Sequence, residues 1–348
     1  MIFQKFSLLF HHNLKQKKII TMLQLVLIIS IGVLAVVVAL VAQRKSKSPE
    51  KSWVYCLIDV ALGPLRLFRL SFYKGGKINV DQIVKDAQKI SKLTDYGGLE
   101  FVGQYKSIDV ISTFHRSQKL TNLGFLAAKM EMTMAFAGRL KKIQYFKENP
   151  GIFNVPVRQP VFVTGLPRTG TTFLHRLLSL DPKTRAPLLW ELVNSVPMAK
   201  ITDSDEEKQK CRKKRRDWVA GKLEMRKFLG DDSLTHIHEI GADLPEECFM
   251  AMREEVPLLL QHLTSVYMDY DAVRYKLDFK AAYQFYKKIL QLMSYQVGET
   301  TDPRRWTLKC PMHLSFTKEI SSVFPDAKLI WYVVYGIHLL HDHVDVEM

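Results

Sequence analysis

The chain reads Pro160-Val-Phe-Val-Thr-Gly-Leu-Pro-Arg-Thr-Gly-Thr-Thr-Phe-Leu-His-Arg-Leu-Leu178 near its middle, and this stretch carries its clearest structural signal. Val161–Thr164 is short, apolar and β-branched, which is typical of a buried parallel strand. Gly165 and Gly170 permit backbone angles that other residues resist, and a helical pattern starts near Thr171. A helix that follows such a loop points its unpaired N–H groups and the positive end of its dipole at the loop. The stretch therefore predicts an anion-binding loop in an α/β domain.

The spacing of Gly165 and Gly170 matches part of the loop that binds nucleoside triphosphates. That motif continues with Lys and then Ser or Thr, whereas this chain has Thr171 and Thr172 and carries its cation inside the loop, at Arg168. No apolar strand ending in Asp is evident to hold Mg²⁺ as in kinases. A P-loop kinase is therefore a weaker alternative.

Three segments resemble PAPS-dependent sulfotransferases, which use 3′-phosphoadenylyl sulfate (PAPS) as sulfate donor. Leu166-Pro-Arg-Thr-Gly-Thr-Thr172 resembles their 5′-phosphosulfate loop, in the branch with Arg in the loop that includes tyrosylprotein and carbohydrate-type enzymes. Trp306-Thr-Leu-Lys-Cys-Pro-Met-His-Leu314 resembles their second core strand, and Phe324-Pro-Asp-Ala-Lys-Leu-Ile-Trp331 the strand before the 3′-phosphate site. The resemblance covers 156–331 and implies a central parallel sheet with flanking helices.

The resemblance also implies a donor site and a reaction. Sulfuryl transfer to a hydroxyl or amine depends on positioning and charge stabilisation, by analogy with phosphoryl transfer. Arg168 would bind the phosphosulfate because its planar fork matches such oxygens. The expected donor-binding residues are Gly165, Pro167, Arg168, Thr169, Gly170, Thr171 and Thr172, and no metal is expected.

Two further residues receive catalytic roles from the resemblance. In the Arg-loop branch a Glu about twenty residues beyond the loop acts as general base, and Glu191 stands at a similar spacing. The alternative is a Glu that is exposed or ion-paired at a loop. Lys309 would stabilise charge on the sulfonate and the leaving oxygen; the alternative is a surface Lys at a strand end.

Histidines mark a candidate acceptor pocket. His236 and His238 flank Ile237, so both rings face the same way if the segment is extended, and the family has a comparable stretch before Pro-Glu-Glu. His313 follows Lys309 and is a third candidate. The alternative for this region is a capping box of Asp243 and Glu246 at a helix start.

The N-terminal part of the chain predicts a membrane anchor. A basic segment, 1–21, precedes an uncharged apolar run, 22–42, which is long enough for a transmembrane helix. A polar linker follows at 43–51. Basic residues flank the run on both sides, so the sequence leaves the orientation open. We expect a single-pass protein of the Golgi or endoplasmic reticulum membrane.

The remaining chain divides at the turn Asn149-Pro150-Gly151. Apolar spacing predicts a helical segment over 52–150, with helices at 80–93 and 120–145. The sulfotransferase-like domain is expected over 151–334 and a tail outside the family pattern over 335–348.

The charge balance favours anionic binding partners but does not identify which kind. The net charge is +15 and the pI is near 9.5, which favours anionic partners. The apolar fraction of 47% is ordinary for a globular protein. A basic run at Lys208–Arg216 follows several acidic residues and predicts a solvated helix with opposed charge blocks. The four cysteines lack metal-ligand spacing. We expect a glycan, peptide or small-molecule acceptor and no nucleic acid.

The sequence departs from the family after Trp331. There the family has an Arg and a later Ser that clamp the 3′-phosphate of PAPS, whereas this chain reads Tyr332-Val-Val-Tyr-Gly and stops at Met348. The expectation is a C-terminally truncated family member. A second hypothesis is therefore a catalytically inactive, membrane-anchored binding protein with the same fold.

Overall fold

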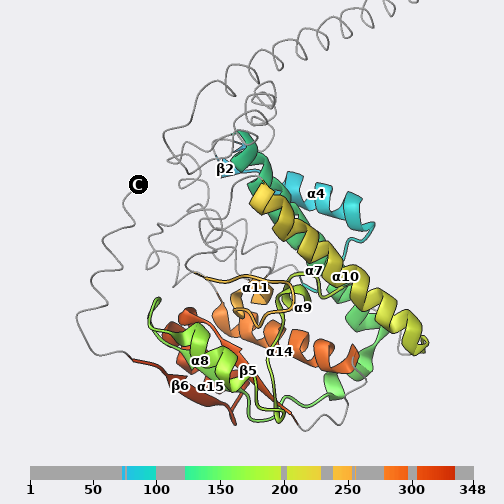
Figure 1. Cartoon of the computed structure of the whole chain (residues 1–348). Helices are drawn as coiled ribbons and strands as arrows, with labels where there is room; N and C mark the ends of the chain where they lie inside the picture. The colour runs from blue at the N-terminus through green and yellow to red at the C-terminus, as the bar shows by residue number, and fades with distance from the viewer. Residues whose placement is uncertain are drawn as a thin grey trace, which may run out of the picture.

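The computed structural model describes residues 73–74, 77–98, 122–196, 202–228, 238–252, 255, 278–296 and 304–333 (Figure 1). The predicted membrane segment 22–42, the linker 43–51 and the tail 335–348 lie outside the described residues. Within the described ranges, every helix is too short or too polar to cross a bilayer.

A parallel sheet of four strands forms the centre of the domain, in the order β4-β5-β3-β6. The strands are β3 (Val161–Thr164), β4 (Thr184–Arg185), β5 (Arg305–Lys309) and β6 (Lys328–Trp331). β3 pairs with β5 and with β6, and β4 pairs with β5. The predicted α/β fold with a central parallel sheet is confirmed.

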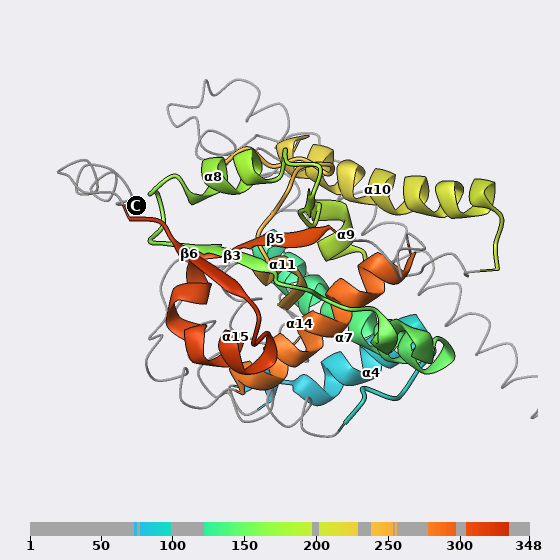
Figure 2. The same ribbon diagram turned by 90° about the horizontal axis from the view of Figure 1, so that it is seen from below.

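Helices cover both faces of this sheet (Figure 2). α8 (Thr171–Leu178) lies on one face, and α14 (Phe279–Gln296) and α15 (Thr317–Val323) lie on the other. The carboxyl ends of β3 and β5 lie beside the start of α8, where Lys309 at the end of β5 contacts Thr172.

Side chains of β5 alternate between these two faces, as in any strand. Trp306 and Leu308 are buried in the main hydrophobic core, together with Phe162 of β3 and Tyr286 of α14. Lys309 points to the opposite face, where it contacts α8. The alternation explains how one short strand supplies both the core and the site.

Two helices form a smaller core before the sheet. α4 (Val80–Ser91) begins at the cap Asn79, whose side chain accepts a hydrogen bond from the Gln82 N–H at 3.1 Å. It packs on α7 (Asn122–Glu148) in a cluster separate from the main core. Helices were predicted in both places. Phe146, near the end of α7, belongs to the main core and joins the two parts.

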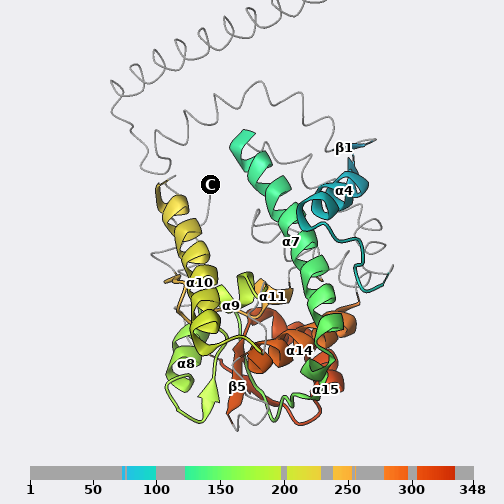
Figure 3. The same cartoon turned by 90° about the vertical axis from the view of Figure 1, so that its right-hand side faces the viewer.

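Short elements complete the described chain. These are β1 (Tyr73–Lys74), β2 (Lys77–Ile78), η2 (Pro150–Asn154), α9 (Leu189–Val193), α11 (Phe249–Met252) and η3 (Pro311–Phe316). The long helix α10 (Asp205–Phe228) stands apart from α7 when the molecule is viewed from the side (Figure 3). The acidic residues of the charge run occupy its first turn, where they complement the helix dipole.

Candidate functional site

The predicted loop has the expected strand–loop–helix geometry. Gly170 caps α8 with φ of 92°, a left-handed conformation that favours glycine. At Gly165 a Cβ atom would lie 2.5 Å from the carbonyl oxygen of Tyr332, so this position admits no side chain. Arg168 also has a positive φ, of 65°, and its side chain is exposed. The loop is therefore closely packed at its base and presents its cation to solvent.

Hydrogen bonds of threonine hydroxyls fix the loop. Thr169 donates to the Leu166 carbonyl at 2.8 Å, which closes the turn. Thr164, at the end of β3, donates to the Cys310 carbonyl at 3.1 Å and so ties the loop to the end of β5. α8 has no side-chain hydrogen bond at its cap, so its first N–H groups are available to an anion.

Lys309 brings a second cation to the loop from the neighbouring strand. Its residue is aligned with Val163 of β3, and its side chain is almost fully buried, with 1% exposed. The ammonium donates to the Thr172 hydroxyl at 3.1 Å and to Glu247 at 2.5 Å. Sequence positions 172 and 309 are thus neighbours in space, as the resemblance implied.

Glu247 is a member of this site that the sequence analysis missed. Its backbone is held there because the Cys248 N–H donates to the Lys309 carbonyl at 2.9 Å. On the other side, the Glu246 N–H donates to the Pro187 carbonyl at 3.1 Å. The sequence signal was present in the Pro-Glu-Glu stretch, but no local pattern relates that stretch to β5.

Glu191 occupies a different environment. It is 8% exposed and lies in the first turn of α9, where it accepts a hydrogen bond from the Leu188 N–H at 3.0 Å. Its other oxygen accepts from Arg185 at 2.9 Å, and that guanidinium stacks over the Trp306 ring at 4.6 Å. These contacts give Glu191 a structural role as an ion-paired cap. Its role as general base stays a prediction.

His238 is half-buried and pairs with the buried Glu246. Its Nε2 lies 2.9 Å from Glu246 Oε2, and the Glu246 side chain is 2% exposed. Burial acts to raise the pKa of Glu246, but the hydrogen bond and charge of His238, the Glu247 N–H and the charge of Lys309 together outweigh it, so the pKa is lowered. Asp243 instead pairs with Arg216 at 2.5 Å and lies in a turn. The alternative of a capping box is therefore wrong, and His236 lies outside the described residues.

His313 lies in the core behind the sheet. Its Nδ1 is 2.7 Å from the Tyr283 hydroxyl, and its ring packs edge-on against Phe162 at 5.0 Å. Burial lowers the pKa of His313 to about 3, so the imidazole is neutral. These contacts are those of a core histidine, and the assignment to an acceptor pocket stays a prediction.

A second buried histidine, His175, belongs to α8 and was not singled out from the sequence. Its Nε2 is 3.0 Å from the Thr307 carbonyl, and burial lowers its pKa to about 4. A neutral ring here fixes α8 on β5 without adding a charge behind the loop.

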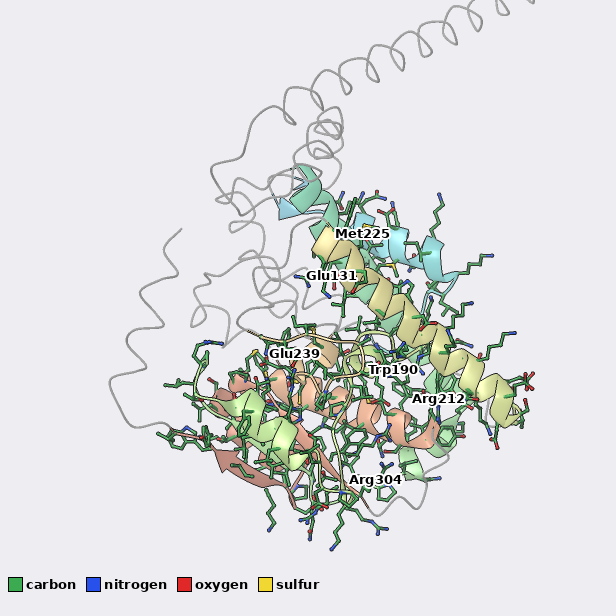
Figure 4. All side chains as sticks on the ribbon, viewed as in Figure 1. Glu131, Trp190, Arg212, Met225, Glu239 and Arg304 are labelled. Atoms are coloured by element: carbon green, nitrogen blue, oxygen red, sulfur yellow. The ribbon has the colours of Figure 1, made fainter. Side chains whose placement is uncertain are left out.

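The charged helix α10 is anchored rather than fully solvated. Arg215 is 4% exposed, donates to the Asn194 carbonyl at 2.7 Å and stacks on the Trp190 ring at 4.7 Å. The neighbouring Lys213 and Lys214 are exposed, as predicted. Figure 4 shows Arg212 and Met225 along this helix, away from Glu239 beside α8. The charge run therefore lies outside the loop site.

A metal centre has no candidate in the described ranges, where no group of three His, Cys, Asp or Glu residues could hold an ion. The described features define an α/β protein with a cationic, glycine-based loop at the carboxyl edge of a parallel sheet.

Comparison with known proteins gives the family. The model of a family described as "Sulfotransferase family" matches residues 160–333, half of the chain. The chain belongs to the sulfotransferase family. None of the curated proteins searched matches it significantly.

Two solved structures resemble the chain. Sulfotransferase STF9 from Mycobacterium avium is 26% identical with a TM-score of 0.57, over 73% of this chain and 62% of that one. Sulfotransferase STF1 from Mycobacterium tuberculosis H37Rv is 24% identical with a TM-score of 0.52, over 75% of this chain and 68% of that one, and shows a shared fold. The chain thus spans about two thirds of the length of each structure.

Proposed function

We propose that this chain binds PAPS at the 165–172 loop and transfers its sulfuryl group to a hydroxyl or amine acceptor. The observation that carries the proposal is the convergence of Lys309 and Thr172 at the loop. An ammonium, a hydroxyl and the start of α8 there face the same space, and all three favour an anion.

The residues present fit the phosphosulfate end of PAPS. Arg168 would bind non-bridging oxygens from the solvent side of the loop. Lys309 would stabilise the charge that develops as the acceptor oxygen bonds to sulfur and the bond from sulfur to the phosphate oxygen breaks. Glu191 is the proposed acceptor of the hydroxyl proton.

The part of the chain that would bind the 3′-phosphate of PAPS departs from the family pattern. This departure favours a second candidate function. Directly after Trp331 the sequence reads Tyr332-Val333-Val334, without the family Arg at this place. Each charge-assisted hydrogen bond to a phosphate contributes about 1.5–3 kcal/mol. Without an Arg at this place the chain would bind the donor more weakly, and binding without turnover is the alternative to catalysis.

The membrane anchor is part of the proposal. The uncharged run at 22–42 would hold the domain at a Golgi or endoplasmic reticulum membrane. Extraction of membranes with alkaline carbonate tests this part: an anchored chain stays in the pellet, whereas a peripheral chain is released.

Calorimetric titration of the full-length chain in detergent tests the donor. The ligand is 3′,5′-ADP (PAP, the desulfated product of PAPS), and ATP is the control. We expect PAP to bind, ATP to give no heat, and Arg168→Ala to abolish PAP binding. If the folded chain gives no binding heat with PAP, or binds ATP as tightly as PAP, the proposed donor is refuted.

Turnover is then measured with PAPS and a panel of phenol, steroid, glycan and peptide acceptors. Glu191→Ala should retain PAP binding and lose sulfate transfer. Unchanged transfer by that variant would exclude Glu191 as the base. A chain that binds PAP but transfers sulfate to none of the panel supports the binding-protein alternative.

A further inference from the structure

Glu247 pairs with Lys309, the cation that the proposed donor anion would also use. The carboxylate lies 2.5 Å from the Lys309 ammonium, on the same nitrogen that reaches Thr172 of the loop. An ammonium has three N–H donors, and two of them are used here. One donor remains, so a bound phosphosulfate would share the ammonium with the Glu247 carboxylate, and the two anions would compete for its positive charge.

The carboxylates of this region differ in how firmly they are held. Glu191 bonds both an arginine and a backbone N–H. Glu246 is 2% exposed and accepts from His238 and from the Glu247 N–H. The Glu247 carboxylate has a single strong contact among the described residues, with Lys309, and a weak one to the Cys310 thiol at 4.0 Å.

Exposure distinguishes the two partners of this ion pair. The Lys309 side chain is 1% exposed, whereas the Glu247 side chain is 19% exposed. The lysine cannot leave without unpacking the sheet from α8, but the glutamate can turn towards solvent. The ion pair can therefore open on the side of the glutamate.

Electrostatic repulsion between the donor anion and the Glu247 carboxylate would open this ion pair. An unpaired ammonium at such a depth is costly, so a partner is needed when no donor is bound. A phosphosulfate brings more negative charge and better-placed oxygens than a carboxylate, and two anions beside one ammonium repel each other.

We propose that Glu247 is a displaceable partner of Lys309, which holds the ammonium at the loop when the donor is absent and yields it to the donor anion. Glu247 is a positioning residue in this scheme. It lowers donor affinity and keeps Lys309 in place for the next donor. The inference rests on the proposed function, because it assigns the competing anion to PAPS.

The test compares variants of the full-length chain in detergent, with PAP and inorganic pyrophosphate as probes. Glu247→Gln removes the competing charge and keeps the size of the side chain, so PAP should bind about tenfold more tightly. The KM for PAPS should fall by a similar factor, while kcat does not rise. Glu239→Gln is the matched control: it removes an exposed carboxylate that pairs with Arg176 of α8 at 2.6 Å, and it should leave PAP affinity unchanged.

A second variant covers loss of folding. Glu247→Asp retains the charge but shortens the reach to Lys309, so it should tighten PAP binding in the same direction by about threefold. Cooperative thermal unfolding establishes that each variant is folded. Lys309→Met should lose PAP binding whichever residue stands at 247.

Each outcome bears on the inference. Unchanged or weaker PAP binding by folded Glu247→Gln and Glu247→Asp overturns it and leaves the proposed donor intact. A wild-type chain that binds pyrophosphate but not PAP refutes the proposed donor, and tighter pyrophosphate binding by Glu247→Gln would then still support displacement. If wild type and Glu247→Gln bind neither probe, both proposals fail.

Discussion

Two buried neutral histidines predict that this protein loses stability in mild acid. Burial lowers the pKa of His175 to about 4 and that of His313 to about 3, against an ordinary value of 6.5. Below pH 6.5 the unfolded chain therefore binds protons that the folded chain does not. Stability is fully present above this value, falls as the pH drops below it, and levels off only below the folded pKa values.

The magnitude follows from the width of that window. Each histidine costs about 1.4 kcal/mol per pH unit between its two pKa values. From about pH 6.5 to pH 5 the two together should remove roughly 3 kcal/mol, because each unfolded histidine is already half protonated at pH 6.5; this is a large share of the usual 5–15 kcal/mol. Glu246 adds nothing in this range: its folded pKa lies below the ordinary value of 4.5, so its contribution is lost only at lower pH.

Urea unfolding of the full-length chain in detergent, followed by tryptophan fluorescence, measures this dependence at constant ionic strength. His313→Gln offers the Tyr283 hydroxyl a partner that does not titrate, so the slope between pH 6.5 and pH 5 should fall by about half. A free energy of unfolding that is flat over this range, or a slope that His313→Gln leaves unchanged, would refute the reasoning.

Two further predictions concern the loop and its surroundings. Gly165→Ala places a Cβ atom 2.5 Å from the Tyr332 carbonyl, so the unfolding midpoint should fall and PAP affinity with it; a variant with wild-type values would show that the loop base is not closely packed. Arg185→Met leaves the Glu191 carboxylate buried without its partner and should cost about 3–5 kcal/mol in urea unfolding, whereas the double variant with Glu191→Gln should recover part of that loss; equal losses in the single and double variants would contradict the pairing.

The loop could be predicted because its determinants are local. A β-branched run, two glycines at fixed spacing and the start of a helix are contiguous in the sequence. The φ of 92° at Gly170 is an angle that glycine adopts readily and other residues resist. The helices α4 and α7 were predicted for the same reason, since apolar spacing is a property of each segment alone. Lys309 was predicted through resemblance rather than through local pattern.

Glu191 and His313 show the limit of local reasoning. Both were assigned to the site by spacing or by proximity to a motif, and the structure gives them contacts typical of structural residues, an Arg185 ion pair and a Tyr283 hydrogen bond. Glu191 pairs with Arg185, six residues away, as in the ion-paired alternative that the sequence offered. Tyr283 lies 30 residues from His313, so only the tertiary structure brings those two side chains together.

The sequence by itself determined the strand, the glycine loop, the helix that follows and the type of charge at the loop, because each depends on neighbours along the chain. Only the tertiary structure decided which carboxylate meets Lys309. Parallel pairing brings the end of β5 to the loop, and one backbone hydrogen bond from Cys248 to Lys309 places Glu247 beside the ammonium. An ion pair between positions so distant in the sequence exists only once the sheet has formed.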